Sequence, residues 1–257
     1  MDSTAAMKTC FQLCRHHMLT MDLARVVGGI PVTTAADDKK TDTNVREHYW
    51  TMALLGKGGT SPSNSKRYCV FIGVHNLLEA QKTTDCLVAD NVYVHPGFDK
   101  ISMSDDLALL YFTTNKLPLS DQVHPICAPK ALVPPGTFCY VTGWGLTENG
   151  KPSATLYQAE IKVQTDEACQ ARWGSHYKRE NMMCAVGSPG VSNKERQQDS
   201  CSGDSGGPLS CRRSDGTWEL QGIISWGGDC SDRQFPGVYT KIIHFDGLIQ
   251  QAIKDTS

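Results

Sequence analysis

The sequence reads Gly203-Asp204-Ser205-Gly206-Gly207-Pro208 shortly after Cys201, and this stretch is its most informative part. A serine that acts as a nucleophile needs small neighbours, because a substrate must come close to its Oγ. It also needs backbone N–H groups that point at the negative charge developing on the attacked oxygen. Glycines meet both needs, although a Gly-Gly-Pro run by itself usually indicates only a turn. The hexapeptide therefore predicts a nucleophile only if the rest of the chain agrees.

Length and composition describe an ordinary globular protein. The chain has 257 residues, of which 40% are hydrophobic and 20% charged, and its net charge is -2. This charge gives no reason to expect nucleic acid or an anionic membrane as a partner. No apolar run approaches the roughly 18 residues of a membrane-spanning helix, so we expect no membrane segment. The length suits one large all-β domain or two small ones.

The cysteine content indicates the compartment. The chain has 11 cysteines, which predict a disulfide framework in an oxidising environment, and hence a secreted, extracellular protein. Residues 1–25 do not resemble a signal peptide, because His16 and His17 interrupt their apolar stretches. Cys10 and Cys14 lie near these histidines and match zinc ligands in type, yet we expect no metal site and no cofactor.

Short β-like runs separated by Gly, Pro, Asn and Asp follow from Val26 onward. Runs at this spacing predict a sandwich or a barrel. Only the end of the chain has the period of an amphipathic helix, from Phe245 to Ile253. The expected strands include residues 68–74, 107–112, 138–142, 156–163, 219–226 and 237–243.

Other landmarks occur in the order of one known family. Asp106-Leu107-Ala108-Leu109-Leu110 resembles the strand that carries its catalytic aspartate, and Thr142-Gly143-Trp144-Gly145 resembles a family turn. Ser225-Trp226-Gly227 and Pro236-Gly237-Val238-Tyr239 resemble the walls of its specificity pocket. With the hexapeptide, they make the chain from Val26 to about Lys254 similar to the trypsin/chymotrypsin family of serine proteases.

The resemblance implies an all-β fold. It consists of two packed antiparallel six-stranded β-barrels with the active site between them, followed by a C-terminal α-helix. On this basis residues 1–25 form a pro-segment and residues 26–257 a trypsin-like protease domain. The first barrel would cover about 26–125, and the second barrel with the helix 126–257.

The resemblance also implies roles for the residues of the motifs. Ser205 would be the acyl-accepting nucleophile, and the backbone N–H groups of Gly203 and Ser205 would form the oxyanion hole. Asp106 would orient a histidine and stabilise its charged form. The neighbouring Asp105 is the weaker candidate, because the family places the acid directly before Leu-Ala-Leu-Leu.

Asp199, six residues before Ser205, would form the floor of the specificity pocket. A buried carboxylate there requires a cationic partner, because leaving it unpaired is costly. Gly227 and Gly237 carry no side chains that would block the pocket. The resemblance therefore implies cleavage after Arg or Lys.

Arg25-Val26-Val27-Gly28-Gly29 resembles the family's activation site. Cleavage after Arg25 would give Val26 a free ammonium, which would pair with Asp204 and order the oxyanion loop. A zymogen of this kind implies three classes of partner. These are an activating trypsin-like protease, protein or peptide substrates containing Arg or Lys, and protein protease inhibitors.

The general base is missing from the expected place. The family carries it in an Ala-Ala-His-Cys type segment, and neither His48, His75 nor His95 has that context. Cys69 instead runs directly into Val70-Phe71-Ile72-Gly73-Val74, which resembles a stretch found further along the family's chain. By comparison with the family we infer that a block between Cys69 and Val70 is missing, which would leave the first barrel incomplete.

The resemblance implies four disulfides, and their pattern agrees with such a loss. One of Cys10 and Cys14 is left over, as are Cys69 and Cys86, and the family pairs a cysteine like Cys69 with one beside the catalytic histidine. The implied pairs are Cys139–Cys211, Cys169–Cys184, Cys201–Cys230, and Cys127 with either Cys10 or Cys14.

Two functions follow. The first is a trypsin-like serine endopeptidase, made as a zymogen and active in its full-length form. The alternative is a catalytically inactive homologue that acts as a binding or regulatory protein. The nucleophile, the oxyanion glycines, the pocket acid and the activation site are all present, so we favour the first.

Overall fold

The computed structural model describes residues 69–71, 73–80, 87–88, 91–111, 126–147, 149–188, 199–200, 202–228 and 234–254. Several features expected from the sequence lie outside these residues. They are the activation site at Arg25 and Val26, His48, and the cysteines Cys10, Cys14, Cys86, Cys201 and Cys230.

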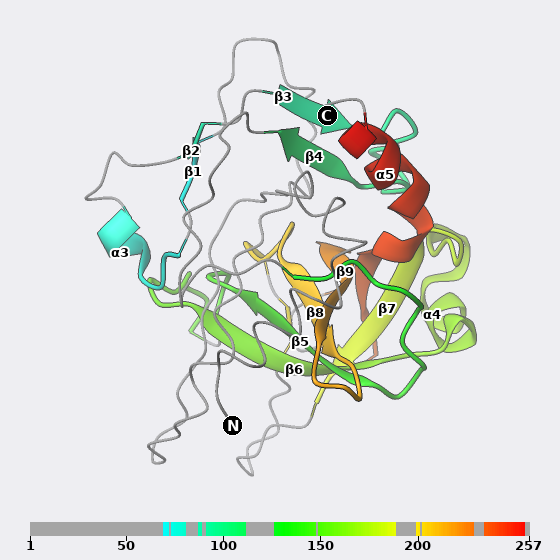
Figure 1. Cartoon of the computed structure of the whole chain (residues 1–257). Coiled ribbons are helices and arrows are strands. Elements are labelled where there is room, and N and C mark those ends of the chain that lie inside the picture. Colours follow the sequence, from blue (N-terminus) through cyan, green and yellow to red (C-terminus); the bar gives the residue numbers. More distant parts are fainter. Residues whose placement is uncertain are drawn as a thin grey trace.

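Six strands of the second half form a closed antiparallel barrel in the order β10-β7-β6-β5-β8-β9 (Figure 1). Side chains alternate between buried and exposed along β5 and β6, as expected for strands with one face toward a core. The strands are β5 Phe138–Gly143, β6 Tyr157–Val163, β7 Met182–Gly187, β8 Pro208–Arg212, β9 Trp218–Trp226 and β10 Gly237–Lys241.

Strand β9 lies between two hydrophobic clusters and is buried on both faces as far as Ser225. Ile224 belongs to the cluster inside the barrel, together with Val141 and Ile161. The adjacent Ile223 points to the other face and packs with Leu107 and Leu109 of the preceding half. The strand therefore packs against the barrel interior on one face and against the segment that contains Asp106 on the other.

The first half is described as two short antiparallel pairs. Strand β1 (Cys69–Val70), which spans the expected junction, pairs with β2 (Leu87–Val88), and helix α3 (Leu77–Ala80) lies between them in the sequence. Strand β3 (Asn91–Val94) pairs with β4 (Ala108–Tyr111). The C-terminal helix α5 (Asp246–Lys254) lies beside β4, and its Ile249 belongs to the same cluster as Leu109 (Figure 1).

Several elements differ from the sequence expectation. Of the strand expected over 68–74, the structure describes only the two residues of β1 as strand, and residues 71, 73 and 74 lie outside it. The strand expected over 237–243 ends at Lys241, because the chain enters the 3-10 helix η3 (Ile242–Phe245) that leads into α5. Helix α4 (Asp166–Trp173), followed by the 3-10 helix η2 (Gly174–His176), was not expected. Its N-terminus is capped by Thr165, whose Oγ1 accepts a hydrogen bond from the backbone N of Ala168 at 3.1 Å. Within the described ranges, no helix has the length and apolar character needed to cross a membrane.

Candidate active site

The Ser205 turn depends on glycine at several positions. Gly203 and Gly206 have φ angles of 103° and 87°, a region that side chains other than glycine rarely adopt. A Cβ on Gly203 would lie only 3.0 Å from the Cα of Gly145, so the backbones approach too closely for a side chain. Ser205 itself is half-buried at the centre of this turn.

Strand β9 holds the Ser205 turn from one side. The backbone N of Gly206 donates to the carbonyl O of Ile224 at 2.8 Å, and the N of Ile224 donates to the O of Gly207 at 2.9 Å. These two bonds fix the residues that directly follow Ser205. The position of the serine is therefore set by strand β9 of the barrel.

Asp106 is held by Ser225, the residue that follows Ile224 in β9. Its side chain is buried, and its Oδ2 accepts a hydrogen bond from Ser225 Oγ at 2.6 Å. Its backbone carbonyl accepts from Thr240 Oγ1 of β10 at 2.8 Å. A buried carboxylate is costly without such partners. The second barrel thus supplies polar partners for an aspartate that belongs to the first half.

The two consecutive aspartates have different surroundings. Asp106 is 5% exposed and bonded to Ser225, whereas Asp105 is half-buried and accepts a hydrogen bond from Asn181 Nδ2 at 2.7 Å. Ser225 and Thr240 were not identified as partners of Asp106 from the sequence. Ser225 lies 119 residues away from Asp106, and nothing local indicates the contact.

Asp199 is half-buried next to Ser200, and its Oδ1 accepts from the backbone N of Ser200 at 2.8 Å. The pKa of Asp199 is raised to about 6, mainly by burial and to a smaller extent by the nearby charge of Asp204, while hydrogen bonds from Ser200 oppose the shift. Ser200 Oγ lies 3.2 Å from Tyr239 Oη in a hydrogen bond. A positive charge close to this carboxylate would offset the cost of its burial.

Gly227 and Gly237 lie close together, and a Cβ on Gly237 would lie 3.4 Å from Ser200 Oγ, next to Asp199 in the sequence. A Cβ on Gly227 would lie 3.3 Å from the Cα of Gly237, and a Cβ on Gly237 would lie 3.1 Å from Tyr239 Oη. Larger residues would therefore fill the space between these strands. The residue that precedes Gly227, Trp226, packs edge-on against Trp173, with 4.8 Å between the ring centroids.

The Asp204 carboxylate lies directly against the backbone of residues 143–145. Its Oδ1 accepts from the backbone N of Gly145 at 2.7 Å. A Cβ on Gly143 would lie 1.9 Å from the same oxygen, and one on Gly145 would lie 2.5 Å from it. Both glycines of the family-like turn are therefore required where this carboxylate lies.

The described histidines do not contact Asp106 or Ser205 through any hydrogen bond that the structure shows. His95 accepts a hydrogen bond from the backbone N of Gly97 through Nδ1 at 3.1 Å, and its ring packs edge-on against Phe245. His75, His176 and His244 are exposed. The part of the chain described here also contains no group of three or more His, Cys, Asp or Glu placed to hold a metal ion.

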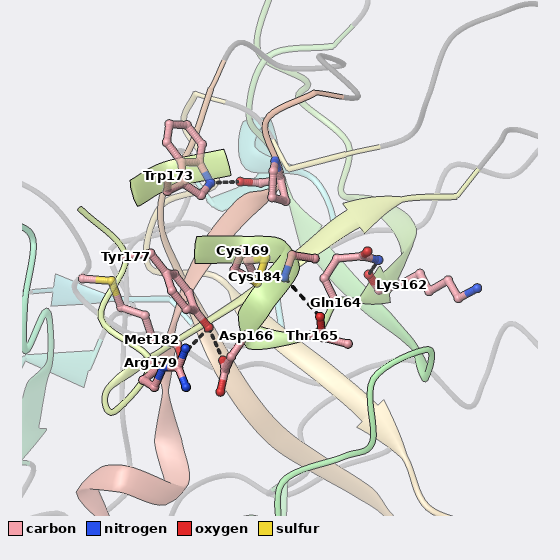
Figure 2. The surroundings of a disulfide bond; sticks show 12 residues. Lys162, Gln164, Thr165, Asp166, Cys169, Trp173, Tyr177, Arg179, Met182 and Cys184 are labelled. Carbon is pink, nitrogen blue, oxygen red and sulfur yellow. Dashed lines mark hydrogen bonds between the residues drawn. A yellow bond between two sulfur atoms is a disulfide. The ribbon is translucent and has the colours of Figure 1, made fainter. Parts of the chain in front are cut away.

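Among the described residues, two of the implied disulfides are formed. Cys139–Cys211 joins β5 to β8, and Cys169–Cys184 joins α4 to β7 (Figure 2). Cys127 is also disulfide-bonded, to a cysteine whose side chain is not described. The implied pair Cys201–Cys230 lies outside the described residues.

Comparison with known proteins gives a consistent result. The family model described as Trypsin matches residues 60–249. A trypsin of Xenopus laevis is 30% identical over 234 residues, covering 89% of this chain and 91% of the relative. Coagulation factor XI of Bos taurus is 35% identical over 183 residues, 68% of this chain and 27% of its own length.

A tryptase of Mus musculus is 35% identical over 172 residues, which cover 62% of this chain and 59% of the tryptase. The match thus spans less than two thirds of the length of factor XI and of the tryptase, and nearly all of the Xenopus trypsin. The chain belongs to the trypsin family of serine proteases.

Proposed function

We propose that this protein, in its full-length form, is a secreted endopeptidase that cleaves peptide bonds after Arg or Lys. One observation carries the proposal. Residues at the end of β9 and directly after it contact several parts of the candidate site. Ile224 holds the Ser205 turn, Ser225 bonds Asp106, and Gly227, the residue after the strand, borders Gly237. One short segment thereby holds the proposed nucleophile, acid and pocket wall together, which supports the preorganisation that acyl transfer requires.

In the proposed reaction Ser205 Oγ attacks the scissile carbonyl, the peptide C–N bond breaks, and the amine leaves with the proton that the general base took from Ser205. Water then hydrolyses the acyl-enzyme, which releases the acid and returns the proton to Ser205. The backbone N–H groups of Gly203 and Ser205 stabilise the oxyanion of each tetrahedral intermediate. Asp106 orients the imidazole that accepts the proton of Ser205 and stabilises its cation. The residues that the structure describes include no histidine in that role, so the step requires a base from outside them.

The proposed specificity comes from Asp199. A substrate guanidinium or ammonium compensates the burial of this carboxylate, which explains a preference for Arg or Lys. Because the pKa of Asp199 is raised to about 6, we expect cation binding to be strong above that pH and to weaken below it.

The proposed zymogen switch uses Asp204. Cleavage after Arg25 of the pro-segment, by a trypsin-like activating protease, gives Val26 an ammonium that pairs with this carboxylate. Asp204 lies directly before Ser205 and bonds Gly145, so a change in its position would move the oxyanion loop. Protein protease inhibitors would bind the same site as substrates.

A second function is supported by the sequence alone. The segment that carries the family's general base is not recognisable before Asp106, so a binding or regulatory homologue without turnover is the alternative. Such a protein would still bind cationic side chains at Asp199. It would form no acyl-enzyme at Ser205.

Active-site titration distinguishes the two functions. The chain is cleaved after Arg25 and mixed with an arginine ester that forms a stable acyl-enzyme, and Ser205→Ala is the control. A burst near one equivalent supports the endopeptidase. The absence of a burst above the control, in soluble and correctly cleaved protein, supports the binding homologue and contradicts turnover by this chain.

A further inference from the structure

The turn that precedes Asp106 has an unusual backbone. Met103 and Asp105 both have φ angles of 54°, in the left-handed region that residues with a Cβ seldom occupy. Such conformations persist only where surrounding contacts hold them. Asp105 is directly joined to Asp106, so the conformation at Asp105 determines the direction in which Asp106 enters the site.

Asn181 provides the contact that holds this turn. It is buried immediately before β7, and its Nδ2 donates to Asp105 Oδ1 at 2.7 Å and to Ser104 Oγ at 2.8 Å. An ionised carboxylate only accepts hydrogen bonds, so the NH₂ group of Asn181 must face Asp105. Its Oδ1 is buried without a hydrogen-bond partner among the described residues. The useful side of this amide is therefore its donor side.

Asn181 itself is held firmly by the second barrel. Its backbone carbonyl accepts from the N of Lys241 at 2.8 Å. Four residues before it, Tyr177 Oη donates to Asp166 Oδ1 at 2.5 Å and lies 3.1 Å from the carbonyl oxygen of Met182 (Figure 2). The Cys169–Cys184 disulfide joins α4, which contains Asp166, to β7, which begins directly after Asn181 (Figure 2). The turn is thus fastened to a rigid part of the molecule.

We propose that Asn181 is a positioning residue for Asp106. By fixing Asp105 in its left-handed conformation, it sets the backbone so that the Asp106 carboxylate meets Ser225. Asn181 acts through Asp105 and has no contact with the reacting atoms. The inference rests on the proposed function only in treating Asp106 as the catalytic acid.

Exchanging donor and acceptor tests the contact. Asn181→Asp turns a carboxylate toward the carboxylate of Asp105 and removes the donor. Asp105→Asn retains a carbonyl oxygen that can accept from Asn181, so it is the matched control. The double variant Asn181→Asp/Asp105→Asn restores one donor and one acceptor of the same shapes. Asp105→Ala removes the acceptor and leaves the second barrel intact, in case Asn181→Asp does not fold.

The first readout needs no turnover. The Leu107 amide donates to the Asp105 carbonyl at 2.8 Å, so its hydrogen exchange reports on the turn. We expect the exchange rate of the Leu107 amide to rise in Asn181→Asp and Asp105→Ala. In the double variant it should return to the wild-type rate, and the amides of β6 should exchange at the same rate in all variants. Equal exchange in Asn181→Asp and Asp105→Asn, or no recovery in the double variant, would overturn the inference.

The second readout applies to protein that gives a burst. We expect kcat to fall by up to about 10²-fold in Asn181→Asp with little change in KM, and to recover in the double variant. An unchanged kcat in Asn181→Asp contradicts the positioning role. If wild-type protein gives no burst, the proposed function fails, and Leu107 exchange still decides whether Asn181 holds the turn.

Discussion

The two halves of the described molecule are stabilised differently. The second half closes a six-stranded barrel on itself, with the Cys139–Cys211 and Cys169–Cys184 disulfides inside it. In the first half, the β3–β4 pair packs on β9 and α5, and Asp106 bonds Ser225 and Thr240. The comparison shows that the second barrel carries its own part of the site and also positions the aspartate of the first half.

The prediction with the largest expected effect compares Asp106 with Asp105. In an active form, Asp106→Asn should lower kcat by about 10⁴-fold, because the amide no longer favours the required tautomer and charge of the histidine. Asp105→Asn should leave kcat within a few-fold, since its side chain bonds Asn181 instead. Both are measured on an arginine ester after cleavage at Arg25. A larger loss in Asp105→Asn would exchange the roles of the two residues.

The next test compares the two contacts that the second barrel makes with Asp106. Ser225→Ala removes a donor to a buried carboxylate and should lower the free energy of unfolding by about 1.5–3 kcal/mol. Thr240→Val removes a bond to a neutral carbonyl and should cost about 1 kcal/mol. Urea unfolding with unchanged m-values measures both. Equal costs would mean that the Asp106 side chain is no better held than its backbone.

A third test concerns Asp199, in the second half, and how its charge changes the stability of the protein with pH. Because the pKa of Asp199 is raised to about 6, the native state binds a proton more readily than the unfolded chain does between about pH 4 and 6. The ionised form is therefore destabilising, and the wild type should lose stability as the pH rises through about 6. We expect Asp199→Asn to be more stable than wild type at pH 8, on the order of 1–3 kcal/mol, with the gap closing by about pH 4.

Urea unfolding at several pH values measures this gap in the absence of ligand. Asp215→Asn is the control, because the backbone N–H of Thr217 lowers the pKa of the exposed Asp215. That variant should show no gain at pH 8. A gap for Asp199→Asn that stays constant across the pH range would contradict a buried, titrating carboxylate. Asp199→Asn should also lose affinity for benzamidine, a cation that resembles the arginine side chain.

Local features of the site could be predicted from the sequence. The glycines around Ser205 indicate a tight turn, and the structure gives Gly203 and Gly206 the positive φ angles that only glycine readily adopts. The glycines of the turn 143–145 are explained by the Asp204 carboxylate that lies against them. Both patterns are visible because a short stretch of sequence meets its own steric requirement.

Contacts between distant segments could not be predicted in this way. Asn181 bonds Ser104 and Asp105 across 77 and 76 residues, and an asparagine before an apolar strand reads as an ordinary turn residue. Helix α4 was missed because only Cys169 among its residues is buried, so it has no apolar period. Tertiary packing decided the contacts of Asn181, and no local pattern records them. Helix α4 does have a local signal, the N-cap Thr165 followed by Asp166 and Glu167, which apolar periodicity does not capture.

The smallest test contrasts two glycines that serve different purposes. Gly247 lies in α5, and a Cβ there would meet no atom within 4 Å, so Gly247→Ala should stabilise the protein by up to about 1 kcal/mol through helix propensity. Gly143→Ala should destabilise it, because the new Cβ would lie 1.9 Å from Asp204 Oδ1. Thermal unfolding should therefore shift in opposite directions. If Gly143→Ala is neutral, the Asp204 carboxylate can leave its seat at little cost, and the oxyanion loop is less firmly fixed than the strands around it.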